Sequence, residues 1–134
     1  MSPAPSRPDS ASDAAAARPY QLDAQAIARL EELDPDGSGR LVQRILRAYA
    51  ASLDRLMVEF RQARTAQQPA VLRRVAHTLK SSSASVGALQ LAALCADLEQ
   101  AVFEPRDLNN GDLLDSLEVE AARVAVAVRA MLER

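Results

Sequence analysis

The side chains best suited to chemistry lie in one short stretch, HTLKSSSASVGA, at residues 77–88. It holds the only histidine of the chain, His77, and the only lysine, Lys80, whereas every other basic side chain is an arginine. Residues three apart on a helix share a face, so the imidazole and the ammonium group would lie together. A neutral imidazole is a nucleophile near neutral pH, which makes a reactive site one interpretation. A histidine that only decorates a helix surface is the other.

The residues next to His77 favour a site that another protein can approach. Ala76 and Leu79 are on the side expected to face the core, so His77 lies one helical step, about 100°, away and is half covered and half open. Small side chains on such a face let another backbone come close. The residues that share or extend the face, and that we expect at a partner-binding surface, are Arg73, Lys80, Ser81 and Ala84.

A carboxylate opposite His77 is expected on the next helix. In an antiparallel pair joined by a tight turn, residues equally far from the turn lie at the same height. His77 is eleven residues before Ala88, and Glu99 is eleven after it. The Glu99 carboxylate would accept a hydrogen bond from one ring nitrogen and leave the other to attack. An ordinary exposed carboxylate is an equally good interpretation from the spacing alone.

The loop DPDGSG has part of a calcium-binding pattern. Asp34, Asp36 and Ser38 stand at positions one, three and five of an EF-hand loop, with a glycine at position six. Position twelve, which must bind calcium through both oxygens of a carboxylate, is Ile45. We therefore interpret the loop as a helix-breaking turn with an N-cap and predict no metal site.

Cys95 is the only cysteine, so the chain cannot form an internal disulfide or supply the usual four zinc ligands. A catalytic thiol would need a histidine and an orienting residue nearby. Cys95 instead lies on the apolar stripe of its predicted helix, where a cysteine acts as a small apolar filler. Ser82 and Ser83 are interpreted in the same way, as small residues for helix packing.

Helical spacing of apolar residues dominates the chain after Tyr20, and no run alternates long enough to predict a strand. The second predicted helix is long and amphipathic, and the third begins near Pro69 and ends at Gly87. The expected helices cover residues 22–34, 38–64, 69–86, 89–102 and 112–132, with a turn at 104–111. The predicted fold is all-α, an antiparallel four-helix bundle with an extra short N-terminal helix packed across one end.

Composition limits the broad class of protein. The 134 residues favour one domain, with residues 1–19 as a disordered tail or linker and 20–134 as the bundle. A net charge of −2 gives no basic face for nucleic acid, and no apolar run is long enough for a membrane span. A single cysteine fits a reducing compartment, so we expect a cytoplasmic protein, and we expect a monomer.

The stretch AHTLKSSSASVGA followed by LAALCADLE resembles the histidine-containing phosphotransfer (HPt) domains of bacterial phosphorelays. The family pattern, His-x-Leu-Lys-Gly-small-small-x-x-hydrophobic-Gly, falls here on His77, Leu79, Lys80, Ser81, Ser82, Ser83, Val86 and Gly87. Ser81 departs from it, because the family most often has glycine there, and should slightly tighten the clearance for a partner. The likeness extends over about residues 20–133, and the family's hydrogen-bond partner of the histidine falls on Glu99.

The resemblance implies a phosphoryl shuttle. A receiver domain with a phospho-aspartate and Mg²⁺ would present phosphorus to Nε2 of His77, with Lys80 beside the phosphoryl oxygens and Ser81 as a hydrogen-bond donor. The implied partners are response-regulator receiver domains and a hybrid sensor histidine kinase. The domain would need no cofactor of its own. The chain has no P-loop, so it is not expected to act as an enzyme on ATP.

A different class of function stays open, namely a helical adaptor that binds a receiver or another signalling partner without carrying phosphate. The residues argue against it, because an adaptor has no need for His77 and Lys80 together. Transfer of an acid-labile label to His77 would separate the two hypotheses.

Overall fold

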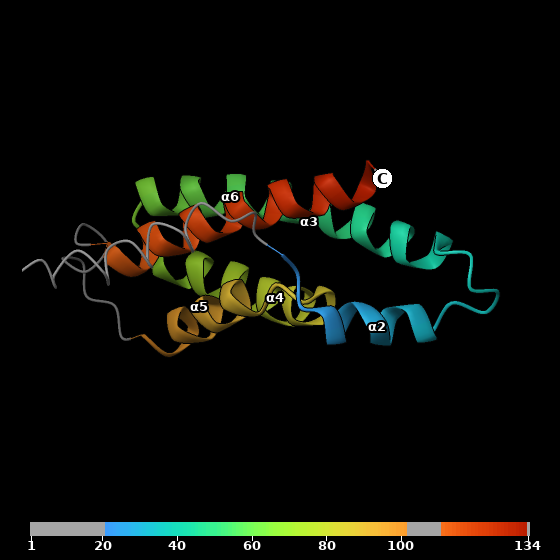
Figure 1. Ribbon diagram of the computed structural model, residues 1–134. Coiled ribbons are helices and arrows are strands. Elements are labelled where there is room, and N and C mark those ends of the chain that lie inside the picture. Colours follow the sequence, from blue (N-terminus) through green and yellow to red (C-terminus); the bar gives the residue numbers. More distant parts are fainter. Residues whose placement is uncertain (1–20, 102–110, 134) are drawn as a thin grey trace, which may run out of the picture.

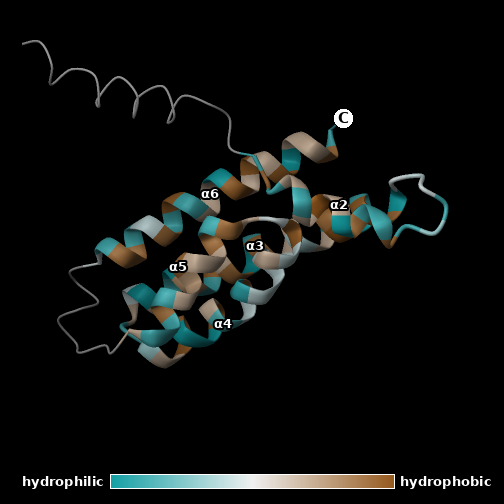
Figure 2. Ribbon diagram, turned by 60° about the horizontal axis from the view of Figure 1, so that its bottom comes forward, coloured by the Kyte–Doolittle hydropathy of each residue, from teal (hydrophilic) through white to brown (hydrophobic). Residues whose placement is uncertain are grey.

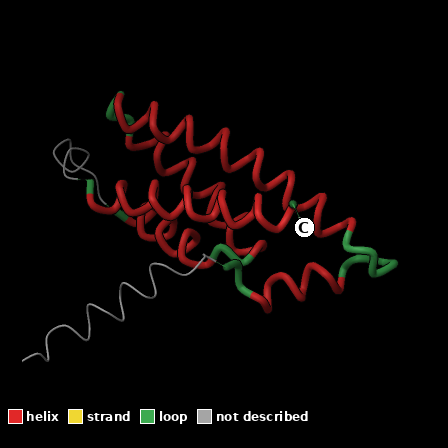
Figure 3. Tube along the Cα trace, turned by 45° about the horizontal axis from the view of Figure 1, so that its top comes forward, coloured by secondary structure: helices red, strands yellow, loops and turns green. Residues whose placement is uncertain are grey.

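The computed structural model describes residues 21–101 and 111–133. This part of the chain contains helices and connecting loops but no strand (Figure 3). None of the helices described is long and apolar enough to cross a membrane. The predicted tail at 1–19 and the turn at 104–110 lie outside the described residues. The predicted all-α fold is confirmed.

Four long helices form a closed bundle, and a shorter one lies at one end of it (Figure 1). Neighbouring helices of the bundle run in opposite directions. The helices α4 and α6 each pack against α3 and α5, so α4 and α6 occupy opposite corners. The bounds are α2 Ala24–Glu32, α3 Arg40–Thr65, α4 Pro69–Val86, α5 Leu89–Gln100 and α6 Asp112–Leu132.

Sequence signals at the helix ends explain where α4 starts and stops. Pro69 lies in the first turn, where its missing N–H is not needed. Gly87 follows the last residue with φ +87°, a left-handed conformation that glycine adopts without strain. The Gly87 carbonyl accepts a hydrogen bond from the Asp23 amide at 2.9 Å. The turn that reverses the chain into α5 therefore also fastens the start of α2.

The core consists mainly of aliphatic side chains from all five helices, together with Tyr49 and Phe60 of α3. The buried residues of α4 follow helical spacing and include Ala76 and Leu79, as predicted: Leu72, Val75, Ala76, Leu79, Ser83 and Val86. Ser83 is a packing residue, as predicted, and its hydroxyl lies 2.8 Å from the Tyr49 hydroxyl in the interior. Leu33 continues the apolar spacing of the helix predicted at 22–34, yet it is 66% exposed, at the C-cap just after α2 ends at Glu32.

Candidate functional site

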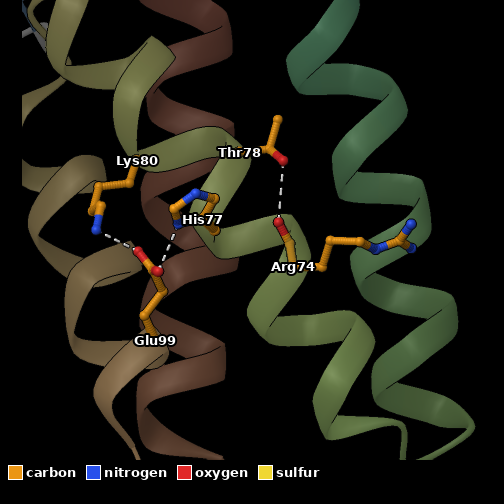
Figure 4. Close-up of polar contacts among 5 residues, drawn as sticks. All are labelled: Arg74, His77, Thr78, Lys80 and Glu99. Atoms are coloured by element: carbon orange, nitrogen blue, oxygen red, sulfur yellow. Dashed lines mark hydrogen bonds and ion pairs between the residues drawn. The ribbon is translucent and has the colours of Figure 1, made fainter.

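His77 lies on the open side of α4 and contacts α5 through one ring nitrogen (Figure 4). Its Nδ1 is 2.8 Å from Oε2 of Glu99, so the contact expected from equal distances to the turn is present. The His77 side chain is 71% exposed, which is more open than the half-covered position predicted. The ring is therefore held at one edge and accessible at the other.

Glu99 binds Lys80 with its second oxygen. The Lys80 Nζ lies 2.6 Å from Oε1 of Glu99, so one carboxylate joins two groups of α4 that are three residues apart. Glu99 is the least exposed of the three, at 22% for its side chain. Its hydrogen bond from Lys80, and then that from His77, lower the pKa of Glu99 from its usual value. Glu99 is thus a carboxylate anion that organises both neighbours.

The contact with Glu99 selects one form of the imidazole. A carboxylate only accepts hydrogen bonds, so Nδ1 of His77 must carry the proton that is shared with Glu99. In the neutral ring the second nitrogen, Nε2, then holds a lone pair. Figure 4 shows this nitrogen pointing away from Glu99. The arrangement presents a nucleophilic nitrogen toward the outside of the bundle.

Arg73 has a contact that its spacing did not predict. Its Nη2 donates a hydrogen bond to the carbonyl oxygen of Ala101 at 2.7 Å. Ala101 caps the C-terminus of α5, two residues after Glu99. Arg73 thereby ties the end of α5 to α4, one turn below His77. Its expected contact with a partner stays a prediction.

The small residues beyond His77 are accessible. Ser81 and Ala84 are both exposed on α4, as the predicted docking face requires. The hydroxyl of Ser82 instead donates to the carbonyl oxygens of Thr78 and Leu79 within the helix. A narrow strip of α4 therefore offers short side chains next to the imidazole.

A different set of contacts occupies the side of α4 that faces α3. The Arg74 guanidinium forms an ion pair with Glu59 of α3, and the Thr78 hydroxyl donates to the Arg74 carbonyl at 3.1 Å (Figure 4). These two residues flank His77 in sequence but point away from Glu99. They serve as neighbours against which the site can be compared.

Cys95 is fully buried on α5, as predicted for a core residue. Burial raises the pKa of its thiol to about 12, because the interior disfavours the thiolate. A thiol that stays protonated is a poor nucleophile. Cys95 therefore packs beneath the site without taking part in it.

The loop between α2 and α3 uses its acidic residues to hold its own backbone. Asp34 accepts a hydrogen bond from the Gly39 amide at 2.8 Å, and Asp36 accepts one from the Ser38 amide at 3.0 Å. The Ser38 hydroxyl in turn accepts one from the Arg40 amide at 3.3 Å. These contacts match the predicted turn before a helix. The α3 N-cap itself is Gly39, without a side-chain cap.

The Lys80–Glu99 ion pair was missed at the sequence level, although a signal existed. Lys80 shares the face of His77, so a carboxylate at the height of His77 lies within reach of both. The Arg73–Ala101 bond had no such signal, because its acceptor is a backbone oxygen. Long side chains choose partners across helices, which spacing along one helix does not determine.

Comparisons with known proteins bear on the family and the fold of the chain. The family model described as Hpt domain matches residues 44–134. No curated protein matches the chain. Among solved structures, the chain is similar to the crystal structure of histidine-containing phosphotransfer protein B from Pseudomonas aeruginosa PAO1, with 24% sequence identity and a TM-score of 0.69. That similarity covers 87% of this chain and 98% of the other, and it shows a shared fold.

Proposed function

Because this chain belongs to the Hpt domain family, we propose that it carries a phosphoryl group on His77 between receiver domains of a phosphorelay. The observation that carries the proposal is the 2.8 Å contact between His77 Nδ1 and Glu99. It leaves Nε2 with a lone pair on a side chain that is 71% exposed. A buried ring could not accept a group from another protein, and a ring with Nε2 turned to the carboxylate would present Nδ1 instead.

The proposed step is an in-line transfer that conserves the phosphoryl group. Nε2 of His77 forms a bond to phosphorus while the bond from phosphorus to the aspartate oxygen of a receiver domain breaks. The aspartate leaves as a carboxylate, and reversal on a second receiver passes the group on. Mg²⁺ is expected on the receiver. Because the transition state is loose, most of the catalysis is positioning and charge stabilisation.

Lys80 and Glu99 supply the charges for that step. The Lys80 ammonium lies three residues from His77, on the same face of α4, and 2.6 Å from Glu99. When the phosphoryl group arrives, Lys80 would exchange the carboxylate for a phosphoryl oxygen. Glu99 stabilises positive charge on the ring once Nε2 is bonded to phosphorus. Arg73 supports both by holding the end of α5 through Ala101. Ser81 and Ala84 are proposed to contact the receiver.

A labelling experiment tests the proposal. A panel of receiver domains, labelled on aspartate with radioactive acetyl phosphate, is mixed with the wild type, with His77→Gln and with Thr78→Ala. We expect acid-labile, base-stable label on the wild type and on Thr78→Ala, whose hydroxyl is bonded within the helix. His77→Gln should remain unlabelled with unchanged helicity. A receiver that binds the wild type without transferring label would make the chain an adaptor instead.

A further inference from the structure

The outward face of α6 leaves apolar side chains uncovered. Val119 is 61% exposed and Val126 is 65% exposed, although valine is usually buried. Ala122 and Ala130 are exposed on the same helix. These four residues, which we name the α6 stripe, follow one another at steps of three, four and four and so share one face. Figure 2 shows α6 along an outer edge of the bundle.

Shallow grooves on both sides extend the α6 stripe. The apolar lining includes Leu94 and Val119 in the groove toward α5, and Val58, Ala122 and Ala125 in the groove toward α3, and polar and charged side chains complete both grooves. Val58 is itself 47% exposed. A contiguous apolar surface with charged residues at its rim is typical of a contact with another protein. The stripe therefore has the shape and chemistry to receive a helix between the two grooves.

The charges along α6 indicate which helix fits. Residues 112–120 contain four acidic residues and no base, whereas residues 121–132 contain two arginines and no acid. A second α6 that lay parallel would put like charges together, while an antiparallel one would put each acidic half against a basic half. We propose that the α6 stripe is a self-association surface, on which a second copy of this chain docks with its α6 antiparallel.

A twofold axis near Ala122 would relate the two copies, so that the same surface serves on both. The exposed charges seven residues to either side of Ala122 are Asp115 in the acidic half and Arg129 in the basic half, while Arg123, exposed beside Ala122, pairs with Glu120 of its own helix at 3.5 Å. Each already has a partner within its own chain: Arg64 lies 2.7 Å from Asp115, and Asp54 lies 3.3 Å from Arg129. In the dimer each of these charges would gain an opposite charge from the second copy.

The position of the stripe leaves the phosphotransfer site open. α6 and α4 occupy opposite corners of the bundle, so a pair joined through α6 would present both His77 side chains outward. The stripe spans twelve residues, and its eleven steps of 1.5 Å give a length of ~17 Å. A contact of that length buries little area, so the dimer should be weak and in exchange with the monomer. The expectation of a monomer from sequence would then hold only at low concentration.

Sedimentation of the full chain over a concentration series tests the proposal. The average mass of the wild type should rise with concentration toward that of a dimer. Val126→Glu should remain a monomer throughout, because it places a carboxylate within the contact, opposite Glu118 of the second copy. The control is Leu33→Glu, which changes an equally exposed apolar residue on another element and should behave as the wild type. A wild type that stays monomeric, or a control that dissociates equally, would overturn the proposal.

Charge exchange tests the antiparallel arrangement. Asp115→Arg and Arg129→Asp should each weaken association, and the double variant should restore it, since the two positions oppose each other across the axis. Association that is not restored would overturn the arrangement, with the melting temperature of each monomer measured alongside. If the full chain stays monomeric and the chain without residues 1–20 becomes dimeric, the N-terminus covers the stripe in the full chain. The second copy would then be the wrong occupant.

Discussion

Two contacts between helices, the α4–α5 seam and the α3–α6 seam, each hold a cluster of three polar side chains. The two clusters contain acidic and nitrogen-bearing groups in opposite ratios. Between α4 and α5 one carboxylate, Glu99, binds two nitrogen groups, those of His77 and Lys80. Between α3 and α6 one guanidinium, that of Arg64, binds two carboxylates, each at 2.7 Å. A guanidinium has five donors and can satisfy both acids at once. Glu99 instead occupies only one nitrogen of a ring that has two.

This difference separates a structural ion-pair cluster from a reactive site. Arg64 is 23% exposed, and its charge is matched by the two acids from α6, so the seam holds the helices together. His77 is 71% exposed, and its contact with Glu99 leaves Nε2 directed outward. The hydrogen bond to Glu99 fixes the orientation of the His77 ring and leaves its second nitrogen free to react. The Arg64 cluster offers no such free group toward a partner. Four changes, taken in order of expected effect, test the contrast.

The largest effect is expected from Gly87→Ala, at the turn that aligns α4 with α5. A Cβ there would lie 2.7 Å from the Asp23 amide nitrogen, and φ is +87°. Clash and strain together should lower the free energy of unfolding by about 2–4 kcal/mol. Urea denaturation measures the loss.

Gly37→Ala is the matched control for that change. Gly37 also has a positive φ, +67°, but an added Cβ would meet nothing within 4 Å among the described residues. The free energy of unfolding of Gly37→Ala should fall only by the backbone strain, about 1 kcal/mol. Equal losses in the two variants would show that the contact with Asp23 does not restrain the turn.

The second change, Lys80→Ala, removes one of the two nitrogen groups on Glu99. Transfer from a labelled receiver should slow by about tenfold to a hundredfold, because charge on the phosphoryl oxygens loses its nearest cation. Circular dichroism should show unchanged helicity. Arg74→Ala removes a cation on the side of α4 that faces α3, and its transfer rate should match the wild type. Equal rates for Lys80→Ala and wild type would reduce Lys80 to a surface charge.

The α4–α5 seam was largely predictable from sequence, for a local reason. Pro69 and Gly87 fix the ends of α4, and apolar spacing fixes its buried side. A short turn then fixes the height of α5, so counting residues placed Glu99 level with His77, and the structure shows that the two side chains are in contact. Each step used positions close together in the chain, where helix geometry leaves few alternatives.

The α3–α6 seam was not predicted, because it joins residues far apart in the chain. Arg64 and Glu118 are separated by 54 positions, and the connection includes a segment outside the described residues. Their pairing depends on how two helices rotate about their axes after the core has packed. The exposure of Leu33 was not predicted for a related reason, because the periodicity of apolar residues does not show where a neighbouring helix ends.

The third change, Arg64→Met, removes the ion pairs between α3 and α6 and should leave the site at His77 unchanged. Asp115 and the partly buried Glu118 would both lose their cation, which should lower the free energy of unfolding by about 1–2 kcal/mol. The rate of transfer to His77 at low temperature should equal that of the wild type. Arg47→Met, an exposed arginine of the same helix, should change neither quantity. A slower transfer in Arg64→Met would show that the two seams are coupled.

The smallest effect concerns acid pH and the charge on Glu99. Lys80 first, and then His77, hold the pKa of Glu99 below its ordinary value of 4.5. A carboxyl group with a lowered pKa in the folded state stabilises the fold above pH 4.5, and this contribution fades as pH falls through the folded-state value. The difference in unfolding free energy between wild type and Glu99→Gln should therefore shrink in strong acid, as pH falls through the folded-state pKa of Glu99. In a Lys80→Ala background the same difference should be smaller at every pH, because the main cause of the lowered pKa has been removed. A difference that keeps growing below pH 4.5 would mean that Glu99 is protonated when it binds His77, and Nε2 would then carry a proton in place of the lone pair.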